Sequence, residues 1–246
     1  MTLSDHPTST EAPRVAHTLG VVASGVLAGF ISGLIAGGVG SRLAMRVLSL
    51  TSPDAQGAMT EAGEVVGEIS LGGTIFLLAA GAVLGMAGGL AYVALRRWLP
   101  KRKTGLAFGL LMLAVSGRVL VDPDNIDFVI LDPASLSIAM FTALPVLFGL
   151  FVVPLQVRLE PFFTKPRSRI ATTLMLVAGL LPLAIGGPLA VAIVILVAVG
   201  FLVARSPTVR YVWAASTVDI YGRALLGAAG IFGLGFFAGG ALEILV

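Results

Sequence analysis

Long apolar runs, separated by short charged or turn-forming segments, dominate the pattern of this chain. A helix that crosses a bilayer needs about 20 predominantly apolar residues. The pattern predicts about seven such spans, at about 16–40, 71–95, 104–121, 134–157, 170–186, 188–204 and 223–245. The fifth and sixth share one apolar run that Gly186-Gly187-Pro188 divides. As a single helix this run would be about 52 Å long, too long for a hydrocarbon core of about 30 Å.

Composition agrees with a membrane protein. The chain is 57% hydrophobic and 12% charged, with a mean hydropathy of +1.00, whereas soluble domains are roughly 45–50% apolar and about 25% charged. We therefore expect an all-α, polytopic membrane helix bundle that forms one domain over 15–246, after a disordered polar tail at 1–14. The start of this tail lacks the basic residues of a signal peptide, so we expect the first span to be retained.

Charged residues alternate between the two sides of the predicted spans. One side carries the basic residues Arg96, Arg97, Lys101, Arg102, Lys103, Arg158, Lys165, Arg167, Arg169, Arg205, Arg210 and Arg223. The other side carries the acidic residues Asp54, Glu61, Glu64, Glu68, Asp122, Asp124, Asp127, Asp132 and Glu243. Because Lys and Arg near span ends stay in the cytoplasm, we expect the N-terminus inside and the C-terminus outside, in a bacterial cytoplasmic membrane.

The basic residues flank apolar spans, where they face lipid headgroups. The lipid bilayer is therefore the expected partner of these residues, and no nucleic-acid partner is predicted.

Two surface helices are also expected. Apolar residues at helical spacing over 59–69, with Glu61, Glu64 and Glu68 on the other face, predict an acidic amphipathic helix outside. Ser206-Pro207 is a helix-start signal that predicts an inner surface helix over 207–221.

Glycine recurs every fourth residue in the first two spans. These glycines are Gly25, Gly29, Gly33 and Gly37, then Gly81, Gly85 and Gly89. Small residues at this spacing let membrane helices approach closely, so we expect the two spans to pack together. The last span, with Gly235 and Gly239, is a third candidate for such packing. A glycine-lined pore is the alternative interpretation.

Prolines mark the fourth and fifth spans. Pro145, Pro154 and Pro182 are expected to bend or interrupt their helices, because proline removes a backbone hydrogen bond. Interrupted helices occur at transport sites, although prolines are also ordinary in membrane helices.

Residue types needed for familiar catalysis are scarce. The chain has no cysteine, and its two histidines, His6 and His17, lie before or at the start of the first span. All lysines lie in predicted inner loops, which excludes a retinal Schiff base within the bilayer. No acid lies in the middle of a predicted span, which weakens a proton relay. We predict no enzymatic activity, no cofactor and no metal site.

Three arginines depart from the charge pattern and lie among the acids. With their acidic neighbours they form a candidate ligand or ion-pair cluster of Arg42, Arg46, Arg118, Glu64, Glu68, Asp122, Asp124 and Asp127. The cluster suits structural ion pairs, or an anionic ligand such as a carboxylate or phosphate. The segment 122–127 also resembles part of a calcium loop, without its Gly and distal Glu. Arg118 lies inside a predicted span and is expected to pair with Asp122 or with the 61–68 acids.

Two functional hypotheses follow. The first is a scaffold or accessory subunit that binds a second copy or another membrane protein through its glycine-rich helices and acidic outer face. The alternative is a small-solute or ion transporter with an outward-facing vestibule of arginines and carboxylates. The lack of charge at mid-bilayer depth favours the first, and the prolines favour the second.

Overall fold

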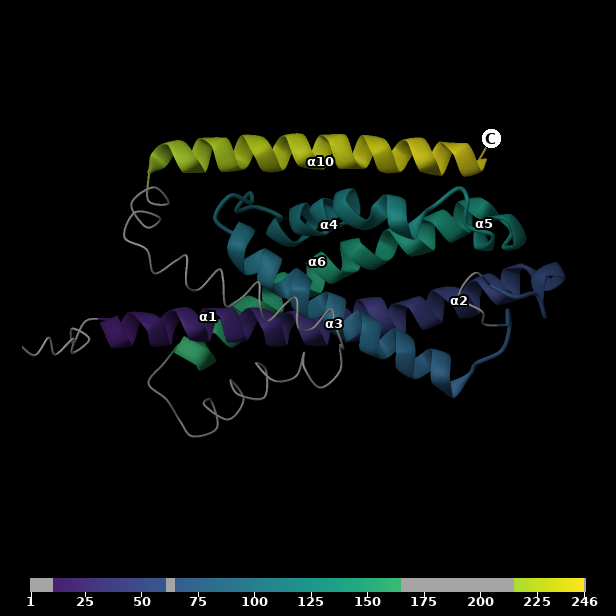
Figure 1. Cartoon of the computed structure of the whole chain (residues 1–246), viewed down its shortest axis with the longest axis horizontal. Helices are drawn as coiled ribbons and strands as arrows, with labels where there is room; N and C mark the ends of the chain where they lie inside the picture. Colours follow the sequence, from purple (N-terminus) through teal and green to yellow (C-terminus); the bar gives the residue numbers. More distant parts are fainter. Residues whose placement is uncertain (1–10, 61–64, 165–214, 246) are drawn as a thin grey trace, which may run out of the picture.

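The structure is a computed structural model that describes residues 11–60, 65–164 and 215–245. These residues form helices joined by short loops, and their only β contact is an isolated bridge between Met59 and Val65. The all-helical class is therefore confirmed. The elements are α1 (Glu11–Ser32), the π-helix η1 (Gly33–Val39), α2 (Gly40–Thr51), the 3-10 helix η2 (Pro53–Ala55), α3 (Leu71–Leu95), α4 (Thr104–Leu120), α5 (Asp127–Ile130), α6 (Ala134–Thr164) and α10 (Ser216–Leu245) (Figure 1).

Four helices are long and apolar enough to cross a membrane. They are His17–Thr51, Leu71–Leu95, Ala134–Thr164 and Ser216–Leu245, and α4 is a shorter apolar helix. The four correspond to the first, second, fourth and last predicted spans, and α4 corresponds to the third. The predicted fifth and sixth spans and most of the 207–221 helix lie outside the described residues.

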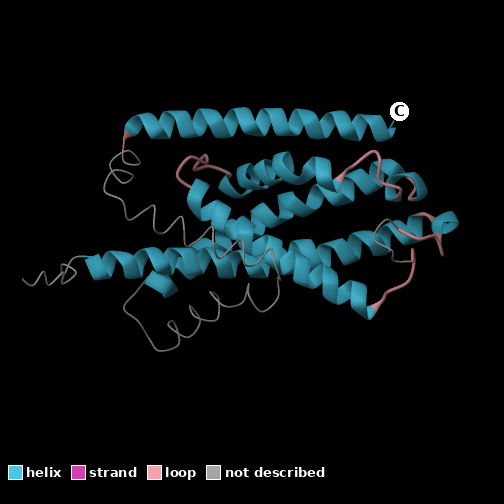
Figure 2. Ribbon diagram, in the orientation of Figure 1, coloured by secondary structure: helices cyan, strands magenta, loops and turns pink. Residues whose placement is uncertain are grey.

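Successive helices run in alternating directions along one long axis (Figure 1). The elements α1, η1 and α2 follow one another without a break and are called the first helix. This first helix packs against both α3 and α6, α4 packs against α6, and α10 packs against α4. The loops gather at the two ends of the bundle (Figure 2). As a result, α6 ends and α10 begins at the same end.

Aromatic rings join three of these helices in the core. Tyr92 of α3 and Phe108 of α4 meet edge to face with ring centroids 5.3 Å apart, and Phe108 lies 6.4 Å from Phe148 of α6. All three rings are buried. Such offset aromatic contacts add to the stabilisation that burial provides.

The first helix is longer than the sequence suggested. The predicted end near residue 40 is wrong, because η1 and α2 continue the helix to Thr51. Leu, Ala, Met and Arg in α2 are strong helix formers, and the fully buried Leu48 shares a core cluster with Leu131, which directly follows α5. Arg42 and Arg46 therefore lie within the helix rather than beyond its end.

The loop between α2 and α3 corrects a second expectation. Its described parts form turns, not the amphipathic helix expected over 59–69: the N–H of Val66 donates to the carbonyl of Ala58 at 2.9 Å. Gly57 and Gly67 have φ of 85° and 93°, a left-handed conformation that glycine adopts without strain and that breaks a helix. Val66 is buried against Leu48, so its apolar character serves loop packing.

Helix α6 runs without interruption through Pro145, Pro154 and Pro161. The prolines of α6 therefore do not interrupt this helix, the expectation that they bend it stays a prediction, and Pro182 lies outside the described residues. Neighbouring helices can satisfy the backbone groups that proline frees in a membrane helix. Here α4 lies close: a Cβ built on Gly149 of α6 would be 2.6 Å from the carbonyl oxygen of Gly105.

Candidate functional site

The structure brings the predicted glycines of the first two spans together. Gly25, Gly29, Gly33 and Gly37 face Gly81, Gly85 and Gly89 of α3. A Cβ built on Gly33 would lie 2.6 Å from the Cα of Gly85, and a Cβ built on Gly85 would lie 2.6 Å from the Cα of Gly33. The two backbones thus touch without intervening side chains, which maximises dispersion contacts where lipid offers no hydrophobic driving force.

A second stripe of small residues on the first helix faces α6, and the sequence analysis missed it. It recurs every four residues as Gly20, Ser24, Ala28, Ser32, Ala36, Gly40 and Ala44. Ser24, Ala28 and Ser32 are fully buried, and a Cβ built on Gly20 would lie 2.6 Å from the carbonyl oxygen of Phe163. The four-residue spacing of small residues is visible in the sequence, but most positions of this stripe are Ser or Ala, so the spacing of glycine alone does not reveal it.

The π-helix η1 lies where both stripes continue. Four residues advance an α-helix by about 400°, so a four-residue stripe drifts by about 40° at each step. A π-helix closes i→i+5 hydrogen bonds, and its wider turn reduces this drift. We infer that η1 keeps Gly33 and Gly37 directed at Gly81, which both of them approach.

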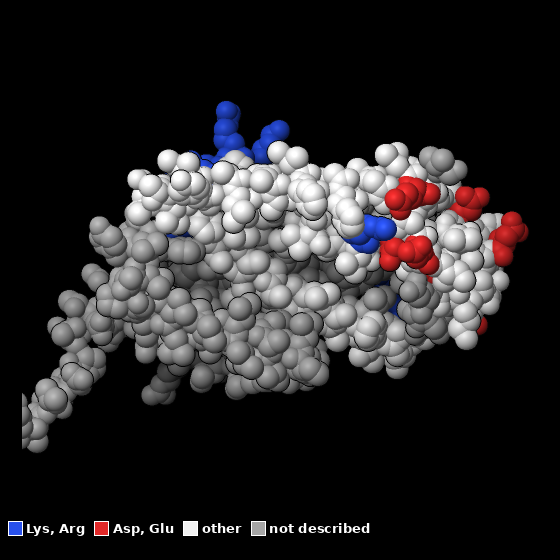
Figure 3. Space-filling model, turned by 45° about the horizontal axis from the view of Figure 1, so that its top comes forward, with Lys and Arg blue, Asp and Glu red and all other residues white. Residues whose placement is uncertain are grey.

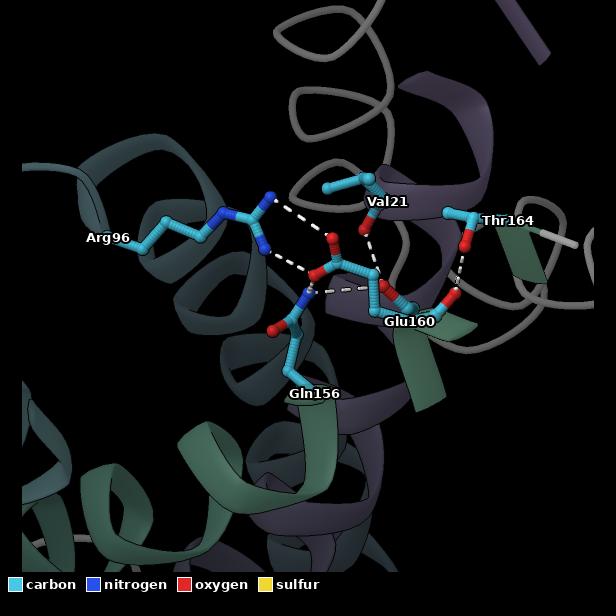
Figure 4. Close-up of polar contacts among 6 residues, drawn as sticks. Val21, Arg96, Gln156, Glu160 and Thr164 are labelled. Carbon is cyan, nitrogen blue, oxygen red and sulfur yellow. Dashed lines mark hydrogen bonds and ion pairs between the residues drawn. The ribbon is translucent and has the colours of Figure 1, made fainter. Parts of the chain in front are cut away.

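A polar cluster of Arg96, Gln156 and Glu160 lies near one end of the contact between the first helix and α6 (Figure 4), and Ser24 joins it through a hydrogen bond with Gln156. Arg96 follows α3, and both nitrogens of its guanidinium tip reach the two carboxylate oxygens of Glu160, with Nη2 to Oε1 at 3.3 Å. The Nε2 of Gln156 donates to Glu160 Oε2 at 2.6 Å and to the Ser24 hydroxyl at 3.3 Å. The cluster therefore links α1, α3 and α6.

Ser24 and Gln156 are fully buried. The Ser24 hydroxyl donates to the carbonyl of Val21 at 2.7 Å, whereas Gln156 Oε1 has no hydrogen-bond partner. A polar group that is buried without a hydrogen-bond partner is costly. The sequence analysis missed this cluster, although a Gln followed four residues later by a Glu, at one end of an apolar run, was a usable signal.

Helix α10 is tied to the bundle at both ends. At its start, Arg97 Nε donates to Asp219 Oδ1 at 2.8 Å. Near its end, Arg118 Nη2 lies 3.8 Å from Glu243 Oε2, and the Arg118 guanidinium lies 5.6 Å from the ring centroid of Phe236. These contacts fix the position of α10 beside α4.

The structure only partly assembles the predicted cluster of arginines and acids. Arg118 Nη1 forms an ion pair with Asp122 Oδ1 at 3.2 Å. Arg42 Nη2 instead donates to the carbonyl of Ser70 at 3.2 Å, and Arg46 is exposed. No ion pair among the described residues joins Arg42 or Arg46 to the Arg118 group.

Two further acids of the predicted cluster, Asp124 and Asp127, lie in one turn with Asp122. The Asp122 carboxylate accepts from the N–H of Asp124 at 3.3 Å, and Asn125 Oδ1 accepts from the N–H of Asp127 at 2.8 Å. These bonds describe a turn capped by its own side chains. In the described part of the chain, no three His, Asp or Glu side chains gather where they could hold a metal ion. Glu68 is exposed, and Glu64 lies outside that part.

Charge is sorted along the molecule. On the face drawn in Figure 3, the acidic side chains gather at one end, where basic side chains also lie beside them, and further Lys and Arg side chains project from the surface nearer the other end. The acidic end holds the α4–α6 connection and the end of α10. The basic end holds the α3–α4 connection and the start of α10.

Comparisons with protein-family models, curated proteins and solved structures find no match to this chain. The class of this protein is therefore argued from its own helices and their composition. It is an all-helical protein with four helices long and apolar enough to span a membrane, consistent with an integral membrane protein.

Proposed function

We propose that this multi-pass membrane protein is a non-enzymatic scaffold or accessory subunit, and that α10 presents its partner-binding face. The observation that supports this role is the difference between the two sides of α10. One side packs against the bundle: a Cβ built on Gly233 would lie 2.8 Å from the Cβ of Ala114, one on Gly240 would lie 3.0 Å from Arg118 Nη1, and one on Gly222 would overlap the ring of Trp98.

The other side of α10 contacts no other described helix. Cβ atoms built on Gly227, Gly230, Gly235 and Gly239 would meet no atom of the described residues within 4 Å. Large exposed side chains flank them, among them Leu225, Ile231, Phe232 and Leu242. A glycine that faces lipid contributes no packing, whereas G-x-x-x-G at a helix contact permits close approach. Gly235 and Gly239 have this spacing, which supports a contact with a second copy or another membrane protein.

The proposed topology places the basic end in the cytoplasm. Arg97, Lys101, Arg102 and Lys103 lie at that end, and positive residues near span ends are retained inside. Because α6 ends and α10 begins there, the predicted hairpin over 170–204 would complete seven spans, with the C-terminus outside. A bacterial cytoplasmic membrane suits this arrangement.

The second candidate is a small-solute or ion transporter. The buried Gln156 and Ser24 favour it, because polar groups at depth often line a pathway. Between this cluster and the acidic end, however, the buried residues of the first helix and α6 include Ala28, Ala36 and Val152, together with Ser32 and Ser137. The almost complete burial of all five side chains indicates close packing, which supports the scaffold over the transporter.

The experiment compares two glycine substitutions on α10 with a control substitution on α3. Gly235→Leu and Gly239→Leu add side chains to open space, so the bundle should fold, but a partner helix should no longer fit. Gly72→Leu is the control, since a Cβ there also meets nothing within 4 Å. Tagged proteins would be purified from native membranes in mild detergent, and bound proteins or second copies identified. The proposal fails if the wild type carries no partner, or if the α10 variants keep it. Uptake of a solute that the α10 variants retain would favour the transporter.

A further inference from the structure

The basic end of the bundle carries two kinds of basic residue. Arg96 and Arg97, which directly follow α3, are neutralised by Glu160 and Asp219. The next three basic residues, Lys101, Arg102 and Lys103, form a basic loop that is exposed. No acidic side chain of the described residues pairs with this loop. Its charge is therefore available to an outside partner.

The basic loop is held in place rather than free. Trp98 packs on α10, where a Cβ built on Gly222 would lie 2.7 Å from Cδ2 of the indole ring and closer still to its Cε2 and Nε1, and Arg97 lies 5.5 Å from the centroid of that ring. The Thr104 hydroxyl donates to the carbonyl of Pro100 at 2.9 Å. These contacts anchor both ends of the loop and limit the entropy that a ligand would have to remove.

Lys103 occupies an unusual backbone position. Its φ of 60° and ψ of 35° lie in the left-handed region, which Gly or Asn occupies with less strain than lysine. A lysine here is not explained by backbone preference. Strained positions of this kind cluster at binding sites, where the side chain is what matters.

We propose that Lys101, Arg102 and Lys103 bind the phosphate of an anionic phospholipid headgroup. The loop joins two apolar helices, α3 and α4, so its residues lie within a few positions of the hydrocarbon on both sides. Trp98 sits beside them, and tryptophan prefers the depth of the headgroups. Lys and Arg at this depth attract anionic lipid, and their N–H donors match phosphate oxygens. This site is independent of the proposed partner face on α10.

Trp98 provides a local reporter for this site. The chain has only two tryptophans, Trp98 and Trp213, so Trp213→Phe leaves one fluorophore beside the loop. This variant would be reconstituted in vesicles that contain brominated phosphatidylglycerol or brominated phosphatidylcholine, whose bromines quench nearby tryptophan. We expect an apparent preference for phosphatidylglycerol of about fivefold at low salt, the effect of about one Lys or Arg at an anionic surface.

Adding K101Q, R102Q and K103Q to this variant should bring the preference close to one. Arg46→Gln, which removes an exposed charge at the opposite end, should leave it unchanged. Raising the salt concentration in the Trp213→Phe parent should also weaken the preference, because salt screens exposed charges; this arm holds even if the triple variant folds poorly. Equal quenching by the two lipids in the parent would overturn the proposal, as would a preference that survives the triple substitution.

Discussion

Gly33 and Gly85 approach each other so closely that neither could carry a side chain in this packing. A Cβ built on either residue would lie 2.6 Å from the Cα of the other, well inside van der Waals contact. Even alanine would force the first helix and α3 apart along their seam. The relationship is reciprocal, so the two positions should respond alike to substitution.

Gly85→Ala should destabilise the folded bundle by about 1–3 kcal/mol, the usual cost of overpacking a close contact. Gly72→Ala is the matched control on the same helix, because a Cβ there meets nothing within 4 Å. Thermal stability in detergent, followed by size exclusion of the protein that remains folded, would compare the two. If both variants have the melting temperature of the wild type, the contact between α1 and α3 does not stabilise the bundle.

The pair of Arg96 and Glu160 should stabilise the basic end. Glu160→Gln removes the carboxylate that accepts from both Arg96 and Gln156, and hydrogen bonds to a charged group contribute about 1.5–3 kcal/mol. Both side chains are partly exposed, so we expect a loss at the low end of that range. The double variant R96Q/E160Q should lose less than the sum of its single variants, in the same melting assay. Additive losses, or a loss equal to that of Arg102→Gln in the exposed loop, would contradict a specific pair.

Arg118→Gln should loosen α10 from α4. A fully buried ion pair would cost about 3–5 kcal/mol when one partner is lost. The side chains of Asp122 and Glu243 are 46% and 65% exposed, so about 1 kcal/mol is the better expectation. Limited proteolysis near the end of α10 would report its release, with Arg46→Gln as the control. Unchanged cleavage in Arg118→Gln would show that Arg118 does not hold α10.

Much of this architecture could be predicted from sequence because lipid imposes simple rules. Span length gave the bounds of α3 and α4 closely, although it ended the first helix near residue 40 rather than at Thr51. Four-residue glycine spacing indicated which faces of α1 and α3 approach. The i+4 spacing of Arg118 and Asp122 also gave an ion pair that is present. These features depend on residues close together in sequence or on one strong periodicity.

The remaining features depend on how distant segments meet. Glu243 lies far from Arg118 in sequence, and only the packing of α10 on α4 brings them together. The link from Gln156 to Ser24 likewise needs the α1–α6 contact. The acidic amphipathic helix was predicted wrongly because the periodicity of its apolar residues outweighed Gly57 and Gly67, whose positive φ favours turns.

Single-cysteine labelling tests the central claim, a helix bundle that crosses the membrane with its basic end in the cytoplasm. The wild-type chain has no cysteine, so Ile126→Cys in the α4–α6 connection and Thr104→Cys at the start of α4 would each be the only thiol. In intact cells, a membrane-impermeant maleimide should label the cysteine at 126 and not the one at 104, whereas both should react after the membrane is permeabilised. Labelling at 104 from outside, with protection at 126, would contradict the orientation. Labelling at both positions in intact cells would contradict the membrane crossing itself.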